Sequence, residues 1–262
     1  MPNIDQHAPG SFCWIELATM DQSAAKDFYG SLFGWKANDF PMGPNDYYTM
    51  FQLDGRDAAA GYTLKPEQRA QGVPAHWMLY IAAPSVDKKA NLAAGKGGKV
   101  LAPPFDVMDI GRMAVIQDPT GAVFSIWEKK KPSGIGVAGV PGTLCWADLS
   151  TPAPERAKEF YSAVFDWKIA AGEGGPGGYL HIQNGEEYIG GIPPEAHRDA
   201  KAPPHWLAYF FVSKCDESAA KAKQLGANLF LPPSTIEKVG RMAIAADPQG
   251  AVFAIFEPLP HA

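Results

Sequence analysis

The chain has 262 residues, of which 46% are hydrophobic and 19% charged, and its formal net charge is −5. This composition is typical of a globular protein, and the length favours two domains. An acidic chain offers no basic surface for nucleic acid, and no stretch reaches the roughly 18 apolar residues of a membrane span. We therefore expect a cytoplasmic protein that binds neither nucleic acid nor a membrane.

The first predicted elements are a strand, a helix and a pair of strands. Residues 12–17 (FCWIEL) have β-type side chains in near alternation. Apolar side chains then recur at helical spacing over residues 24–35, with Asp21 as the predicted N-cap. Residues 47–53 and 58–64 predict two strands, which the turn DGRD joins.

The next stretch repeats this scheme. Residues 76–82 (HWMLYIA) predict a strand, and residues 85–97 predict a helix. The turn signal DPTG at residues 118–121 separates the last two of three short strands. These strands are predicted at residues 99–104, 112–117 and 122–128. The first half of the chain therefore contains two βαβββ units.

The second half of the chain repeats the first. Residues 12–36 match residues 144–168, and GRMAVIQDPTGAVFSIWE from Gly111 recurs as GRMAIAADPQGAVFAIFE from Gly240. A Gly- and Pro-rich segment lies between the copies. We therefore predict an α+β protein of four βαβββ modules. Its predicted parts are a first domain at residues 1–131, a linker at 132–141 and a second domain at 142–262.

This arrangement, with DFYGSLFGW on the first helix and DPTG before the last strand, resembles the vicinal oxygen chelate superfamily. That superfamily includes glyoxalase I, extradiol dioxygenases and bleomycin-resistance proteins. The sequence motifs are similar to those of a tandem-duplicated bacterial branch called glyoxalase-like. The resemblance implies two tandem glyoxalase-like domains with curled mixed sheets. It also implies that the concave face of each sheet, here called a cup, holds a divalent metal.

The resemblance also indicates where metal ligands should stand. In the first domain the positions are Trp14, Met78 and Ser125. In the second domain, Trp146 and Leu207 occupy the first two positions, and the last is also not a carboxylate. A first-row metal normally needs at least three protein ligands of the His, Cys, Asp or Glu type. We therefore predict no cofactor, although the resemblance itself implies a divalent metal.

Alternation along the strands predicts one carboxylate and one imidazole in each cup. Glu16 with His76, and Asp148 with His205, are candidate catalytic acid/base pairs in which the carboxylate orients the imidazole. Two other interpretations stay open. The histidines can be structural and bond to the backbone, or each pair can be the remnant of a weak metal site.

The other cup residues are mostly aromatic or apolar, as expected for a small-molecule site. Arg112 and Arg241 can clamp a ligand carboxylate or phosphate, or form ion pairs with Asp109 or Asp118 and with Glu237 or Asp247. The predicted ligand-binding residues are Trp14, Met78, Tyr80, Ser125, Trp127, Trp146, Leu207, Tyr209, Arg112 and Arg241.

Two functions remain open at this stage. In the first, the chain is a glyoxalase-like enzyme with lyase-like or oxygenase-like activity that needs no metal at the usual positions. In the second, it is a non-catalytic protein that sequesters a ligand or drug. In both, the partner is a small molecule and the protein is a monomer or homodimer. Three cysteines without a CxxC pair predict free thiols.

Overall fold

The first half of the chain folds as two successive βαβββ units. The computed structural model describes residues 4, 6–172 and 178–259. The elements of the first unit are β1 (Phe12–Thr19), α1 (Gln22–Phe33), β2 (Lys36–Gly43), β3 (Asp46–Leu53) and β4 (Arg56–Thr63). After the short helix α2 (Pro66–Ala70) come β5 (His76–Ala82), α3 (Val86–Gly95), β6 (Lys99–Val107), β7 (Gly111–Gln117) and β8 (Val123–Lys129).

The second half repeats this order. Its third unit contains β9 (Leu144–Ser150), α4 (Pro154–Phe165), β10 (Lys168–Ala171), β11 (Leu180–Asn184) and β12 (Glu187–Ile192). A 3₁₀ turn, η1 (Glu195–His197), precedes the fourth unit. That unit contains β13 (His205–Phe211), α5 (Cys215–Gln224), β14 (Asn228–Ile236), β15 (Gly240–Ala246) and β16 (Val252–Pro258).

The strands form two eight-stranded mixed sheets, one from each half of the chain. Their orders are β2-β3-β4-β1-β5-β8-β7-β6 and β10-β11-β12-β9-β13-β16-β15-β14. In the first sheet β1 pairs antiparallel with β5 at the centre, while β4 and β8 flank this pair in parallel. The predicted α+β fold of four βαβββ modules is confirmed. None of the helices in the described ranges is long and apolar enough to cross a membrane.

Local signals in the sequence explain where elements begin and end. The side chain of Asp21 accepts a hydrogen bond from the backbone N–H of Ala24 at 3.0 Å, so it caps α1 as predicted. Gly34 ends the helix in the left-handed conformation, with φ 76°. Asp54 and Gly55 form the tight turn between β3 and β4, both with positive φ.

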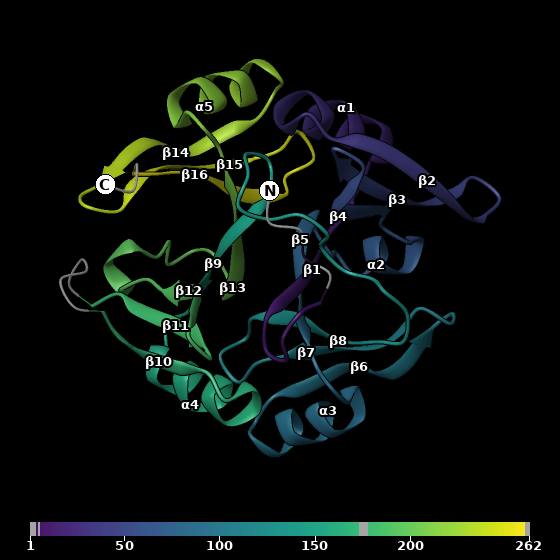
Figure 1. Cartoon of the computed structure of the whole chain (residues 1–262), viewed down its shortest axis with the longest axis vertical. Coiled ribbons are helices and arrows are strands. Elements are labelled where there is room, and N and C mark those ends of the chain that lie inside the picture. The colour runs from purple at the N-terminus through teal and green to yellow at the C-terminus, as the bar shows by residue number, and fades with distance from the viewer. Residues whose placement is uncertain (1–3, 5, 173–177, 260–262) are drawn as a thin grey trace.

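The helices line the seam between the two halves. Figure 1 shows α1 beside α5 at one end of the molecule and α3 beside α4 at the other, with β5 and β13 near the centre. The apolar stripe of α1 enters this seam, where the ring of Phe33 packs at a tilt against Phe210 of the other half with ring centroids 5.0 Å apart. The two sheets therefore share one aromatic core.

A buried hydrogen-bonded chain crosses the seam at Tyr29. Its hydroxyl donates to Oδ2 of Asp247, in the second domain, at 2.9 Å. The same hydroxyl accepts from Nε1 of Trp77 at 3.0 Å. Tyr29 is 0% exposed and Asp247 is 4% exposed, so each polar atom depends on the other for a partner.

An equivalent set of hydrogen bonds crosses the seam elsewhere, with the roles of the two domains exchanged. Tyr161 of the second domain donates to Oδ2 of Asp118 at 2.9 Å and accepts from Nε1 of Trp206 at 2.9 Å. The other oxygen of Asp118 accepts from the backbone N–H of Gly121 at 2.8 Å and so closes the predicted DPTG turn. The repeated turn is thus both a local corner and a contact between domains.

The segment that joins the domains packs along the first of them. Ile135 and Val137 are 3% and 1% exposed. The backbone N–H of Ile135 donates to the carbonyl of Cys13 at 2.8 Å, and that of Gly136 donates to Asp57 at 2.8 Å. The three cysteines are free thiols, as predicted.

Removing the Tyr29 hydroxyl should destabilise the protein. The Tyr29→Phe variant leaves the buried Asp247 carboxylate short of a donor and Trp77 Nε1 without an acceptor. We expect the free energy of unfolding in urea to fall by about 2 kcal/mol. Tyr47→Phe, at a tyrosine that is 40% exposed, is the matched control and should change it by less than about 0.5 kcal/mol. Equal stabilities of the two variants would contradict this assignment.

Candidate functional site

Strand register places the predicted site residues, apart from Arg112 and Arg241, on one face of each sheet, the face of the cup. Trp14 on β1 pairs with Tyr80 on β5, which pairs with Ser125 on β8. Glu16 pairs with Met78 on the same strands. Because directly paired residues point to the same face of a sheet, these five side chains form the floor of the first cup.

The carboxylate of Glu16 is held by two tyrosines. Tyr48 donates its hydroxyl to Oε2 at 2.7 Å, and Tyr80 donates to Oε1 at 2.8 Å. Trp14 Nε1 donates to the Tyr48 hydroxyl at 2.9 Å. Burial raises the pKa of Glu16, and the two tyrosine hydrogen bonds oppose that shift. The first cup therefore contains a dehydrated carboxyl group in a fixed phenolic cradle.

The second cup has the same arrangement around a shorter acid. Asp148 accepts from the hydroxyl of Tyr209 at 2.7 Å and from that of Tyr179. Trp146 Nε1 donates to the Tyr179 hydroxyl at 2.8 Å and to Asp148 Oδ1 at 3.0 Å. Burial raises the pKa of Asp148 against these hydrogen bonds.

Sequence reasoning missed Tyr48 and Tyr179. Tyr48 lies in the third strand of its βαβββ unit and Tyr179 directly precedes the third strand of its own, and the sequence does not state which strand lies near β1 or β9 in the sheet. Alternation on residues 47–53 could have placed Tyr48 on one face with Met50, although not beside Glu16. Tyr179 follows a Gly-rich segment and precedes β11, so no strand pattern marks it.

The two predicted histidines bond to the backbone. His76 Nδ1 lies 2.8 Å from the carbonyl oxygen of Pro74, and His205 Nδ1 lies 2.8 Å from that of Pro203. Among the hydrogen bonds of the described residues, none joins His76 to Glu16. Burial lowers the pKa of His76. The carboxylates are thus paired with tyrosines, and the histidines make the backbone contact of the structural interpretation.

Apolar side chains extend the cup face toward the sheet edges. Phe40 on β2 pairs with Tyr48, and Phe105 on β6 pairs with Met113, so both lie on the face of the first cup. They are 49% and 44% exposed. In the second sheet Leu207 and Tyr209 belong to an apolar cluster that is separate from the main core. This cluster also includes Trp146, Met242, Ala254 and Phe256. Phe40 and Phe105 thus leave apolar surface open on the face of the first cup, whereas Leu207 and Tyr209 are buried in the second.

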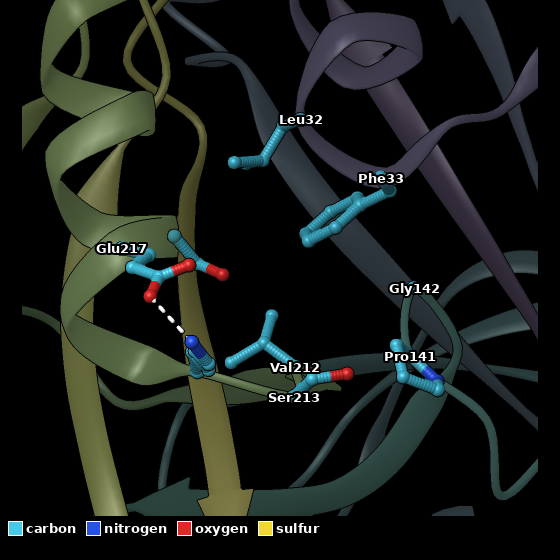
Figure 2. A pocket seen from close by; sticks show the side chains of 9 residues that line it. Leu32, Phe33, Pro141, Gly142, Val212, Ser213 and Glu217 are labelled. Atoms are coloured by element: carbon cyan, nitrogen blue, oxygen red, sulfur yellow. Dashed lines mark hydrogen bonds and ion pairs between the residues drawn. The ribbon is translucent and has the colours of Figure 1, made fainter.

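A separate recess lies at the seam rather than in a cup. Figure 2 shows it between the end of α1, at Leu32 and Phe33, and the start of α5. Its volume is about 310 Å³, and an ion pair of 2.8 Å between Lys214 and Glu217 lies along one side. None of the predicted site residues lines it.

Comparison with known families assigns this fold. The family model described as Glyoxalase/Bleomycin resistance protein/Dioxygenase superfamily matches residues 11–126 and 143–255. The chain belongs to this superfamily. The match covers both halves, in agreement with the duplication seen in the sequence and in the sheets.

Individual relatives cover the whole chain. A Mycobacterium tuberculosis protein named "Putative glyoxylase CFP32" is 38% identical and covers 100% of both chains. The Streptomyces peucetius anthracycline biosynthesis protein DnrV is 33% identical over 97% of this chain and 95% of its own. Among solved structures, the Mn(II)-bound glyoxalase of Novosphingobium aromaticivorans has a TM-score of 0.67 at 16% identity, covering 96% of this chain and 83% of its own. The 2,3-dioxygenase LapB of Pseudomonas sp. KL28 has a TM-score of 0.66 at 13% identity, covering 98% and 95%. These two structures share the fold.

The residues at the superfamily's metal positions do not suit a divalent metal. Trp14 offers an indole N–H that is already bonded to Tyr48, Met78 offers a thioether, and Ser125 offers a buried hydroxyl. In the second cup Trp146 and Leu207 are equally unsuitable. Within the part of the chain that the structure describes, no three His, Cys, Asp or Glu side chains lie close enough to hold a metal ion.

The two arginines lie on the opposite face of the sheet. Arg112 pairs with Glu128, whereas its neighbour Met113 faces the cup. Its guanidinium binds Asp87 of α3 at 2.7 Å and Asp106 of β6 at 3.1 Å. Arg241 binds Asp216 of α5 at 2.5 Å in the same way. The ion-pair interpretation is right in kind, but the predicted partners were wrong. Asp118 and Asp247 bind tyrosines instead, and Asp109 forms an ion pair with Lys131.

The glycine of each GRMA stretch makes room for a cup aromatic. A Cβ on Gly111 would lie 2.2 Å from the ring of Trp127, and one on Gly240 would lie 2.8 Å from the ring of Phe256. Trp127 in turn lies edge-on to Tyr80, with ring centroids 6.5 Å apart. The repeated glycine therefore fixes where the aromatic ring of β8 or β16 sits.

The raised pKa of Glu16 predicts a characteristic pH dependence of stability. The folded protein holds this proton more tightly than the unfolded chain does. The free energy of unfolding therefore falls as pH rises from about 4.3, the ordinary pKa of glutamic acid, through the higher pKa of the folded state. The Glu16→Gln variant does not titrate there, so its stability in urea should improve relative to wild type as pH rises from about 4 to about 7.

Glu67→Gln on the exposed face of α2 is the control for the charge change. Its stability difference from wild type should stay constant over the same pH range. If the stability difference between Glu16→Gln and wild type is also constant, the pKa of Glu16 is not raised in the folded protein.

Proposed function

We propose that the two cups bind a small planar organic molecule that carries hydroxyl or carbonyl oxygens, and that they do so without a divalent metal. The partner is a small molecule rather than nucleic acid or a membrane. The observation that carries this proposal is the buried carboxylate, two tyrosines and one tryptophan that stand in both cups at and beside the superfamily's metal positions.

The hydrogen-bonding capacity of the cups supports a hydroxyl-bearing ligand. Tyr48 and Tyr80 both donate their only proton to Glu16, so each can offer a ligand only an acceptor lone pair. Aromatic rings around these oxygens favour a flat ligand. A hydroxyl on an aromatic or conjugated ring meets both requirements.

The relatives support the same class of ligand. One relative is named for anthracycline biosynthesis, and anthracyclines are planar compounds rich in hydroxyl and carbonyl groups. Others are named as glyoxylases, and glyoxalase chemistry acts on neighbouring oxygens. These names support only the type of molecule. The hydrogen-bonding capacity of the cup residues supports the same type independently.

Binding can be tested with 6-acetyl-2-naphthol, a flat molecule with one hydroxyl and one carbonyl, by isothermal titration calorimetry. We expect wild-type protein to bind it, and binding to be unchanged after dialysis against EDTA. A Trp14→Ala/Trp146→Ala variant should bind at least about tenfold more weakly, because it loses one aromatic wall and one hydrogen-bond donor in each cup.

Leu92→Ala on the outer surface of α3 is the control and should bind as wild type does. Circular dichroism verifies that each variant is folded. Unchanged affinity in the folded double tryptophan variant would contradict the location of the site, and loss of affinity after EDTA treatment would contradict its independence from metal.

Proton transfer is a second candidate function, which the raised pKa of Glu16 and Asp148 favours. A carboxylate with a raised pKa is a stronger base when ionised. It can take a proton from a hydroxyl-bearing carbon beside a carbonyl, while the electron pair moves to the carbonyl oxygen to form an enediolate. The carboxyl group then exchanges this proton for a solvent deuteron and delivers the deuteron to the carbon, which completes the exchange, in keeping with the glyoxylase names of the relatives.

This candidate predicts that the protein catalyses exchange of the carbon-bound hydrogens of hydroxyacetone with D₂O, followed by NMR. The Glu16→Gln/Asp148→Asn variant, shown to be folded by circular dichroism, should lower the exchange rate by about 10²-fold or more. Binding without exchange in the wild-type protein would leave ligand sequestration as the function and exclude this second candidate.

A further inference from the structure

The two cups differ at one position next to the carboxylate. In the first sheet Met50 pairs with Ala60, which pairs with Glu16. In the second sheet His181 pairs with Gly191, which pairs with Asp148. His181 therefore stands where the first cup has Met50. The sequence repeat does not reveal this correspondence because the segments before β3 and β11 differ in length.

Neighbouring groups hold the His181 ring in place. Its centroid lies 5.0 Å from that of Tyr179, 5.5 Å from that of Tyr188 and 6.3 Å from that of Trp146. A Cβ on Gly172 would lie 2.5 Å from both Nδ1 and Cε1 of the imidazole. One edge of the ring thus lies against the Gly172 backbone, and aromatic rings surround the rest.

The hydrogen-bonding state of His181 leaves one nitrogen for a ligand. Among the described residues, Nδ1 is buried and has no hydrogen-bond partner, and Nε2 makes no hydrogen bond. The His181 side chain as a whole is only partly buried. A buried N–H without an acceptor is less tolerable than a buried lone pair. The geometry therefore assigns a ring proton to Nε2, which makes this atom a donor.

We infer that His181 donates a hydrogen bond from Nε2 to a carbonyl oxygen of the ligand in the second cup, which makes this cup selective for aromatic hydroxy-carbonyl compounds. The inference rests on the proposed function and adds a donor to it. Tyr179 and Tyr209 give their protons to Asp148, so they accept from the ligand hydroxyl. The first cup, with the thioether of Met50 at this position, has no such donor.

The test compares two probes that differ only in the carbonyl oxygen, 6-acetyl-2-naphthol and 6-ethyl-2-naphthol, by calorimetry on the full chain. In wild-type protein we expect one of the two sites to prefer the acetyl probe by about tenfold, as one added hydrogen bond gives. His181→Met copies the first cup into the second and should abolish the preference at that site. Affinity for the ethyl probe should change less than about twofold.

Met50→His is the reciprocal variant and should give the first cup the same preference, so that both sites discriminate. If His181→Met retains the wild-type ratio between the probes, the inference is overturned while the proposed function stands. If neither probe binds wild-type protein, the proposed function fails and the inference fails with it. A preference that disappears in His181→Met and appears in Met50→His supports both.

Discussion

A buried carboxylate must be given hydrogen-bond donors, and this chain meets that need in the same way four times. In each case a tryptophan N–H donates to a tyrosine hydroxyl, and the tyrosine donates to the carboxylate. The four relays are Trp77–Tyr29–Asp247, Trp206–Tyr161–Asp118, Trp14–Tyr48–Glu16 and Trp146–Tyr179–Asp148. Breaking any of them would remove one donor from its carboxyl group, so these contacts help to fix both the seam between the domains and the floors of the cups.

The location of each relay decides what it can do. Those of Asp118 and Asp247 are enclosed between the two halves, where they hold the domains together. Those of Glu16 and Asp148 lie on the cup face of each sheet. The same arrangement of hydrogen bonds therefore joins the domains in one place and holds polar side chains on the cup faces in the other.

Much of this could be predicted from the sequence, because it depends on local periodicity. The strands, the helices, the cap at Asp21 and the duplication are all visible in short stretches. Glu16 and Asp148 follow from alternation on one strand. The partners do not. Tyr48 reaches Glu16 from another strand, and Arg112 finds Asp87 on a helix rather than the turn aspartates nearby in sequence. Which residues form hydrogen bonds or ion pairs with each other depends on strand order and helix placement, and local sequence patterns do not determine these.

The seam has a consequence for how such a chain can arise. Each half presents a tyrosine to the other's turn aspartate and receives the same contact in return, so the interface is self-complementary about a two-fold axis. A protein of half this length, carrying one tyrosine and one turn, could satisfy both contacts by pairing with an identical copy. Once two such copies are fused, the residues of each cup can change independently. A dimer of identical chains would have the same residue in both cups, whereas this chain has His181 in one cup and Met50 at the equivalent position of the other.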